Sequence, residues 1–313
     1  MTESSVLSDT IVGMNYDIRP ITEDDMPAIA ALYNHCFDAD RSVEATRAKF
    51  DTRPTGHPLT GHVALSEEGD VVSFCGLVPV EMRVGGERIL GAQSVDVMTH
   101  PDHRKAGLYV DVAQRTYDLG ASRGIKVVFA FPNKNSLHGL RHNLGWEIRG
   151  EMVGLSMRRS WWHRLVKRGV VNVHAEVDRL TIDAKHVLDL EFDGVAKTAP
   201  YLDYKAVCSG SRLIEFEDLI VWLKPGDRLD VASFAWTGED GPSDRKLFQS
   251  FQRLMQSLGA SSIRFCFTAN HPLLKLIKPH CKAHPSTPFG LKALDKNLEV
   301  PELHICRGDF DYF

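Results

Sequence analysis

The sequence predicts an α/β (α+β) protein that folds as two domains, and three observations support this prediction. The chain has 313 residues, a length more typical of two domains than of one. Runs with strand-like alternation and runs with helical periodicity follow one another along the chain. Residues 119–133 are echoed by residues 258–270, since each stretch has Leu-Gly-Ala-Ser, a short apolar run and then an asparagine.

Composition excludes several classes of protein. A hydrophobic content of 43% and a charged content of 25% are ordinary for a globular domain, and a net charge of −4 gives no overall attraction to nucleic acid. The six cysteines have neither Cys-x-x-Cys pairs nor metal-ligand spacing, which favours reduced thiols in a cytoplasmic protein without a metal. No run reaches membrane-spanning length, and the polar residues 1–14 are expected to form a disordered tail.

The N-terminal part predicts a strand, two helices and a meander of strands. Tyr16–Pro20 alternates and stops at proline, and Thr22 then serves as an N-cap before three acidic residues. The helix that follows has one apolar face, and Val43–Phe50 is a second helix. The apolar face comprises Met26, Ile29, Ala30, Tyr33 and Phe37. Two hairpins come next, one joining His62–Leu65 to residues 71–78 and one turning at residues 84–87.

The stretch from Ser94 to Tyr109 is the most informative part of the chain. Val95–Met98 alternates as a strand, Pro101 ends that strand, and the basic loop His103–Gly107 leads into a helix from about Leu108. The first N–H groups of a helix lack intrahelical partners and carry the positive end of its dipole. A glycine beside them lets a phosphate approach the backbone. This pattern predicts a pyrophosphate site.

The same residues resemble the acyl-CoA signature of the GNAT acetyltransferase superfamily, R/Q-x-x-G-x-G/A. Arg104 and Gly107 match it, while Tyr109 stands where a small residue is usual. The chain also resembles the subgroup with a T-H-P-x-x-R-x-x-G pattern, whose next strand ends in F-P-N, here residues 131–133. A helix ending at Asn143 then leads to a Gly-Trp pair, as in the second half of a GNAT cofactor site. The resemblance covers about residues 16–155.

This resemblance implies that acetyl-CoA or another acyl-CoA binds as co-substrate, without a metal. It implies a cofactor site formed by the strand end, the basic loop and the next helix start, namely Val97, Met98, Thr99, Arg104, Lys105, Ala106, Gly107, Leu108, Asn133 and Ser136. The acceptor is expected to be a small molecule, an amino sugar or an envelope precursor that carries an amine. Transfer is expected to be direct, because no Cys/His pair or Ser/His/Asp set is evident.

The resemblance also implies tandem GNAT-like domains, each with a mixed, mostly antiparallel central sheet flanked by helices. The expected divisions are a tail (1–14), an acyl-CoA-binding domain (15–157), a linker (158–198) and a domain without a cofactor site (199–313). The second domain is expected to lack the cofactor because Glu239, Asp240 and Asp244 lie where phosphates would need cations.

Candidate acid and base residues differ from the usual pattern. Many GNAT enzymes have a tyrosine acid four residues before the final glycine, and Arg141 stands there, with His138 and His142 read as helix surface rather than as catalysts. Asp96 is the nearest carboxylate for a general base, its alternative being a hydrogen-bonded strand acid. The terminal carboxylate of Phe313 is the other candidate, by similarity to some double-GNAT enzymes.

The segment Arg158–Arg168 interleaves basic residues with Trp161 and Trp162. It is interpreted as an interdomain linker whose tryptophans pack on the first domain, with an interfacial helix on anionic lipid as the alternative. Three functions therefore compete. They are an acyltransferase, a protein that senses acyl-CoA without chemistry, and a peripheral membrane protein with a vestigial CoA site.

Overall fold

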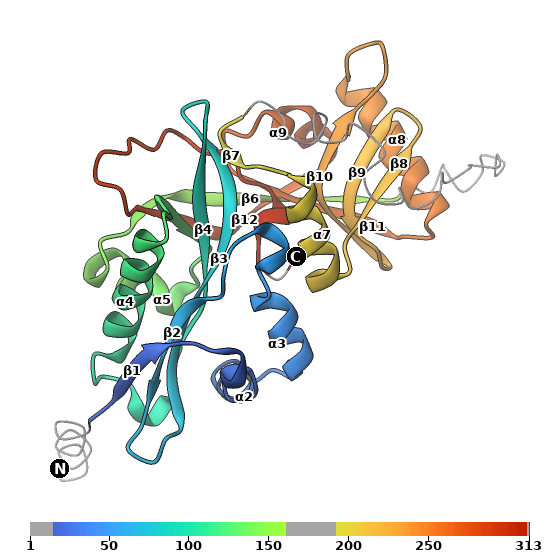
Figure 1. The fold of residues 1–313 in the computed structure, drawn as a ribbon. Helices are drawn as coiled ribbons and strands as arrows, with labels where there is room; N and C mark the ends of the chain where they lie inside the picture. Colours follow the sequence, from blue (N-terminus) through green and yellow to red (C-terminus); the bar gives the residue numbers. More distant parts are fainter. Residues whose placement is uncertain (1–14, 161–191, 312) are drawn as a thin grey trace, which may run out of the picture. The chain divides into compact units, whose positions relative to one another are not determined.

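The computed structural model describes residues 15–160, 192–311 and 313 (Figure 1). The expected N-terminal tail and the tryptophan pair of the basic segment lie outside these residues. The chain divides into two compact units. Unit 1 comprises Met1–Val80, Leu90–Glu147 and Gly290–Leu298, and unit 2 comprises Glu81–Ile89, Ile148–Phe289 and Glu299–Phe313.

Unit 1 has a mixed sheet with the strand order β1-β2-β3-β4-β5-β12. Its first three neighbours are antiparallel, β4 and β5 are parallel, and β12 runs antiparallel to β5. The strands are β1 (Asp17–Pro20), β2 (Thr60–Leu65), β3 (Val71–Val84), β4 (Glu87–Thr99), β5 (Val127–Ala130) and the end of β12 (Lys282–Ala293). The helices are η1 (Glu23–Asp25), α2 (Met26–Phe37), α3 (Val43–Phe50), η2 (Arg53–Thr55), η3 (Pro101–His103), α4 (Leu108–Ser122) and α5 (Lys134–Asn143).

Alternation along the strands separates the two faces of this sheet. Cys75 and Leu77 pack with α4 and α5 in one apolar cluster, which includes Val112 and Leu140. Phe74 points to the other face, where its ring contacts that of Phe50 from α3 edge-on at 5.2 Å. Helices α4 and α5 thus cover one face, and α2 and α3 cover the other (Figure 1).

Unit 2 repeats this order of elements. An antiparallel meander β8-β9-β10 is followed by a helix, a strand β11 parallel to β10, and a further helix. Strand β6, which comes earlier in the chain, closes this sheet by pairing antiparallel with β11. The strands are β6 (Glu147–Arg158), β7 (Gly194–Val195), β8 (Arg212–Phe216), β9 (Leu219–Lys224), β10 (Arg228–Trp236) and β11 (Ser262–Phe267). The helices are α7 (Ala199–Ser209), α8 (Asp244–Ser257), α9 (Pro272–Ile277), η5 (Lys278–His280) and η6 (Arg307–Asp309).

The closing strands of the two units are exchanged along the chain. The strand that follows α5 is β6, and it pairs with β11 in unit 2. The strand that follows α9 is β12, and its residues Gly290–Ala293 pair with β5 in unit 1. The units therefore differ in composition from the two consecutive ranges predicted from sequence.

The predicted α/β (α+β) class is confirmed by these mixed sheets and flanking helices. Within the described ranges, no helix combines the length and the apolar character that crossing a bilayer requires.

Candidate functional site

The end of β4 lies beside an opening in the sheet of unit 1. Strand β4 pairs with β5 at Gly91–Gln93. Beyond this point β4 continues to Thr99, whereas β5 ends at Ala130. The last part of β4 therefore presents backbone groups that β5 does not reach.

A break in regular geometry occurs at Asp96, within this last part of β4. Its φ of +51° is in the left-handed region, which costs free energy for a residue with a side chain. The carboxylate lies 2.5 Å from a guanidinium nitrogen of Arg41 and 2.8 Å from Nζ of Lys49, and it is 4% exposed. These two ion pairs hold the strand in its irregular conformation, just before Val97.

The loop after β4 has two more residues with positive φ, Lys105 at +71° and Gly107 at +81°. Gly107 is the N-cap residue of α4 and provides no capping side chain. In the described part of the chain, the backbone N–H groups from Lys105 to Tyr109 have no hydrogen-bond partner. They sit at the positive end of the α4 dipole with the exposed cations Arg104 and Lys105, an arrangement suited to binding an anion.

A cavity of about 740 Å³ joins this loop to the end of β4. Nine of the ten residues predicted to hold the cofactor line it, and Ala106 does not. The predicted residues are Val97, Met98, Thr99, Arg104, Lys105, Gly107, Leu108, Asn133 and Ser136. The further lining residues are Cys36, Phe37, His103, Tyr109, Val110, Asn135 and Asn143.

Asn133 forms the N-cap of α5 at the edge of this cavity. Its side-chain oxygen accepts from the N–H groups of Asn135 at 2.9 Å and Ser136 at 3.0 Å. The oxygen is thus engaged within the protein, and the amide nitrogen of Asn133 is the end suited to a ligand.

Cys36 and Phe37 are lining residues that the sequence patterns did not identify as part of a site. Phe37 was expected on the buried face of its helix, but the ring is 43% exposed because α2 ends there at the cavity. The thiol of Cys36 donates to the carbonyl of Thr99 at 3.5 Å. Burial raises the pKa of this thiol, although Arg104 partly offsets the effect. The contact with Thr99 places Cys36 at the cavity, but the two residues are 63 positions apart in the chain, so no local sequence pattern indicates it.

The two carboxylates expected as candidate bases lie in different units, Asp96 in unit 1 and Phe313 in unit 2. Asp96 adjoins the cavity-lining residue Val97, but each of its oxygens already accepts from a cation. Phe313 belongs to unit 2, where its ring lies edge-on to Trp222 at 5.5 Å. His138 and His142 are exposed on α5, with ring centroids 4.5 Å apart.

No metal centre accompanies these residues: the described ranges contain no group of three or more His, Cys, Asp or Glu side chains that could hold an ion.

Fold and site together define an α/β domain with a cavity between a strand end and a helix N-terminus. Residues 17–149 match the family model described as Acetyltransferase (GNAT) domain. This part of the chain is therefore similar to a GNAT acetyltransferase domain, and the matched range contains every residue predicted to hold the cofactor. No curated protein matches the sequence.

Solved structures share the fold over most of the chain. A GCN5-related N-acetyltransferase from Kribbella flavida is 15% identical with a TM-score of 0.67, covering 91% of this chain and 72% of that one. One from Anabaena variabilis ATCC 29413 is 12% identical, with a TM-score of 0.61 and coverage of 90% and 73%. Eis1 from Mycobacterium abscessus is 13% identical, with a TM-score of 0.57 and coverage of 89% and 74%. At such identities the likeness concerns the fold alone.

Proposed function

We propose that this protein is an N-acyltransferase that moves an acetyl or short acyl group from acyl-CoA to an amine. The acceptor class is a small molecule, an amino sugar or an envelope precursor. The observation that carries the proposal is the row of N–H groups from Lys105 to Tyr109, which have no hydrogen-bond partner among the described residues and belong to the loop beside the same cavity as the open end of β4. Such a row is a binding site for a pyrophosphate.

The cofactor would lie along the cavity from the loop to the strand. The pyrophosphate would accept from the backbone of residues 104–108, with Arg104 and Lys105 adding charge. The pantetheine amides would pair with β4 as an added strand does. Because the carbonyl of Thr99 already accepts from Arg104 and Cys36, Val97 is the better acceptor for that pairing.

Direct transfer to the amine fits the lining residues. A covalent acyl-enzyme would need an activated nucleophile, and Cys36 is the cysteine that lines the cavity. Its raised pKa disfavours the thiolate. A backbone N–H near Met98 would stabilise the oxyanion that forms when the amine attacks the thioester.

The amine must also lose a proton. Because both oxygens of Asp96 are held by cations, we assign this residue to positioning β4 rather than to proton transfer. The terminal carboxylate of Phe313 is then the remaining carboxylate candidate, and removal of the last residues tests it. A strong loss of kcat with unchanged acyl-CoA affinity would support that role.

Unit 2 is proposed to be a GNAT-like domain that binds no CoA. Its helix α8 corresponds in order to α4, but Ser243 caps it by accepting from the N–H of Lys246. Asp240 pairs with Lys246 at 3.1 Å, and Asp244 lies 3.1 Å from Nε2 of His280. A phosphate there would face carboxylates instead of free N–H groups.

Two measurements on the full chain test the proposal. Release of free thiol from acetyl-CoA is followed with a panel of amines, and calorimetry gives the stoichiometry of CoA binding. We expect one CoA per chain and turnover with at least one amine. Tight binding without turnover across the panel would instead indicate an acyl-CoA sensor, and two CoA per chain would contradict the assignment of unit 2.

A further inference from the structure

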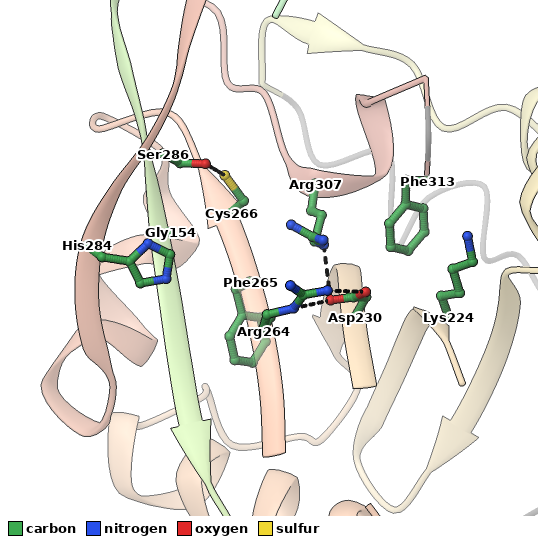
Figure 2. Close-up of a pocket in the computed structure, with 10 residues that line it drawn as sticks. All are labelled: Gly154, Lys224, Asp230, Arg264, Phe265, Cys266, His284, Ser286, Arg307 and Phe313. Carbon is green, nitrogen blue, oxygen red and sulfur yellow. Dashed lines mark hydrogen bonds and ion pairs between the residues drawn. The ribbon is translucent and has the colours of Figure 1, made fainter. Parts of the chain in front are cut away.

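Unit 2 contains a second cavity, of about 470 Å³, whose chemistry differs from that of unit 1 (Figure 2). Its charged lining residues are Lys224, Asp230, Arg264 and Arg307. Nothing in the GNAT resemblance or in the function proposed above requires these groups, so the cavity calls for its own explanation.

The sheet register brings three of these residues into one row. Asp230 of β10 is the cross-strand neighbour of Lys224 in β9 and also of Arg264 in β11. Val231 and Ile263, the adjacent residues in sequence, point to the opposite face, which packs with α8 and α9 in the apolar core. Alternation therefore places the charged row on the face away from that core.

The positive charges in and beside this row, including Arg307, exceed the single negative charge of Asp230. Arg264 forms two hydrogen bonds with the Asp230 carboxylate, at 2.6 and 2.7 Å, and this pair is complete by itself. Arg307 approaches the same carboxylate with its Nε 3.3 Å from Oδ1. That nitrogen is buried and has no hydrogen-bond partner among the described residues.

Lys224 adds a third cation. It lines the cavity, is half-buried, and has no ion-pair partner among the described residues. Three cations thus line a partly enclosed space in which Asp230 is the one acidic side chain among the lining residues. Like charges held this close repel one another, and a bound anion would relieve the repulsion.

The other walls limit the size and character of a ligand. Gly154 of β6 leaves room for the ring of His284, which a Cβ at that position would overlap. The ring of Phe313 forms an apolar wall on the other side and is 2% exposed (Figure 2). The cavity therefore combines an excess of cationic donors with one apolar surface, as in sites that bind small organic anions.

We propose that this cavity of unit 2 binds a small anion with a carboxylate or phosphate group, held by Arg307 and Lys224 and oriented against Phe313. Neither Arg307 nor Lys224 has a role in the acyltransferase function proposed for unit 1. Guanidinium groups suit both kinds of anion because their planar N–H pairs match two oxygens at once. The apolar wall favours a ligand with a short hydrocarbon part beside the anionic group.

The test uses calorimetry on the full chain with two probes, inorganic phosphate and benzoate. We expect one of them to bind with a dissociation constant on the order of 1 mM or tighter, and the probe that binds tells phosphate from carboxylate recognition. Arg307→Met and Lys224→Met should each weaken that binding at least tenfold. Lys275→Met on α9 removes an exposed lysine on the opposite side of the sheet and should leave binding unchanged.

Two further readouts keep the outcome unambiguous. Circular dichroism shows whether each variant folds. If Arg307→Met does not fold, Lys224→Met still tests the site, because Lys224 is only half-buried. Acyl-CoA affinity should be the same in all three variants, so failure here is distinguishable from failure of the acyltransferase proposal. The inference is overturned if neither probe binds, or if binding persists in both folded cavity variants.

Discussion

The ring of Tyr109 occupies the space beside Gly139: a Cβ atom on Gly139 would lie 2.8 Å from Cε1 of that ring. Tyr109 is in the first turn of α4 and Gly139 is in the middle of α5. This packing explains the tyrosine that stands where the acyl-CoA signature usually has a small residue. The large side chain, Tyr109, is on α4, and the glycine that leaves room for it, Gly139, is on the facing helix α5.

We expect Gly139→Ala to lower both stability and acyl-CoA affinity. The added methyl group would displace the Tyr109 ring, and overpacking of this kind costs about 1–3 kcal/mol, more than the ~1 kcal/mol that alanine gains in helix propensity. Thermal unfolding and calorimetry measure the two effects. Tyr109→Ala in the same chain should recover part of the loss, whereas additive effects of the two substitutions would show that these residues do not interact.

A second prediction concerns the charge at the loop. Gly107→Asp should weaken acyl-CoA binding at least tenfold, about 1.4 kcal/mol, because it puts a negative charge beside the proposed phosphates. Nothing lies within 4 Å of the new Cβ position, so the effect is not steric.

Gly107→Asn separates charge from backbone strain, since asparagine tolerates the left-handed region as well as aspartate does. It should bind acyl-CoA much more tightly than the Asp variant in the same calorimetric titration. Gly124→Asp makes the same change at the other end of α4, where φ is +87°, and should have little effect on affinity. Equal binding by the Asp and Asn variants would remove the phosphate from this loop.

Asp96→Asn distinguishes a positioning role from a general base. We expect it to destabilise the protein by about 3–5 kcal/mol, because Arg41 and Lys49, with side chains 16% and 8% exposed, lose their counter-charge. Urea unfolding measures this loss. Asp240→Asn is the control, since the side chains of Asp240 and its partner Lys246 are 87% and 45% exposed and exposed pairs contribute at most about 1 kcal/mol. A kcat reduced about 100-fold with unchanged stability would instead identify Asp96 as the base.

Local patterns in the sequence were sufficient for most elements of unit 1. The expected helix Val43–Phe50 has those bounds in the structure, and α4 begins at Leu108 as expected. Both were predictable because apolar periodicity and the glycine before Leu108 act within a few residues. The cofactor loop belongs to the same kind of local signal.

Contacts between distant residues could not be predicted in this way. Asp96 meets Arg41 and Lys49 across 55 and 47 positions, so its carboxylate looked available in the sequence. The charged row of unit 2 depends on the register of β9, β10 and β11, and the exchange of β6 and β12 depends on which strand edge each one meets. No short-range pattern encodes either feature.

Acid should destabilise the protein through His271. Burial lowers the pKa of His271 to about 3, while an unfolded histidine titrates near 6.5. The unfolded state therefore binds the proton more readily between these values, and stability falls as pH drops below about 6.5. The loss approaches ~1.4 kcal/mol per pH unit, or about 2 kcal/mol at pH 5.

Urea unfolding of the His271→Asn variant at pH 7 and pH 5 isolates this contribution. Nδ1 of His271 caps α9 by accepting from the N–H of Leu273 at 3.2 Å, and asparagine also serves as an N-cap. The variant should therefore lose less stability on acidification than the parent. His138→Asn changes an exposed histidine and should retain the parent's pH dependence. An unchanged slope in His271→Asn would show that the proton is taken up elsewhere.

The exchanged strands predict that the first half of the chain does not fold by itself. A fragment of residues 1–160 lacks Gly290–Ala293, which pair with β5. It also lacks the buried side chain of Leu291 and the Lys292 ammonium, which donates to the carbonyl of Leu144 at 2.5 Å. Strand β5 would then present an open edge.

Joining residues 282–298 to this fragment through a flexible Gly/Ser linker should restore cooperative unfolding and acyl-CoA binding, measured by circular dichroism and calorimetry. The same fusion with Leu291→Asp places a charge at a position that is 2% exposed and should stay unfolded, because burying an unpaired charge is costly. Cooperative unfolding and full acyl-CoA affinity in the unfused fragment would mean that β12 is dispensable for unit 1. In that case the consecutive domain ranges expected from the sequence would describe the folding units better than the exchanged ones.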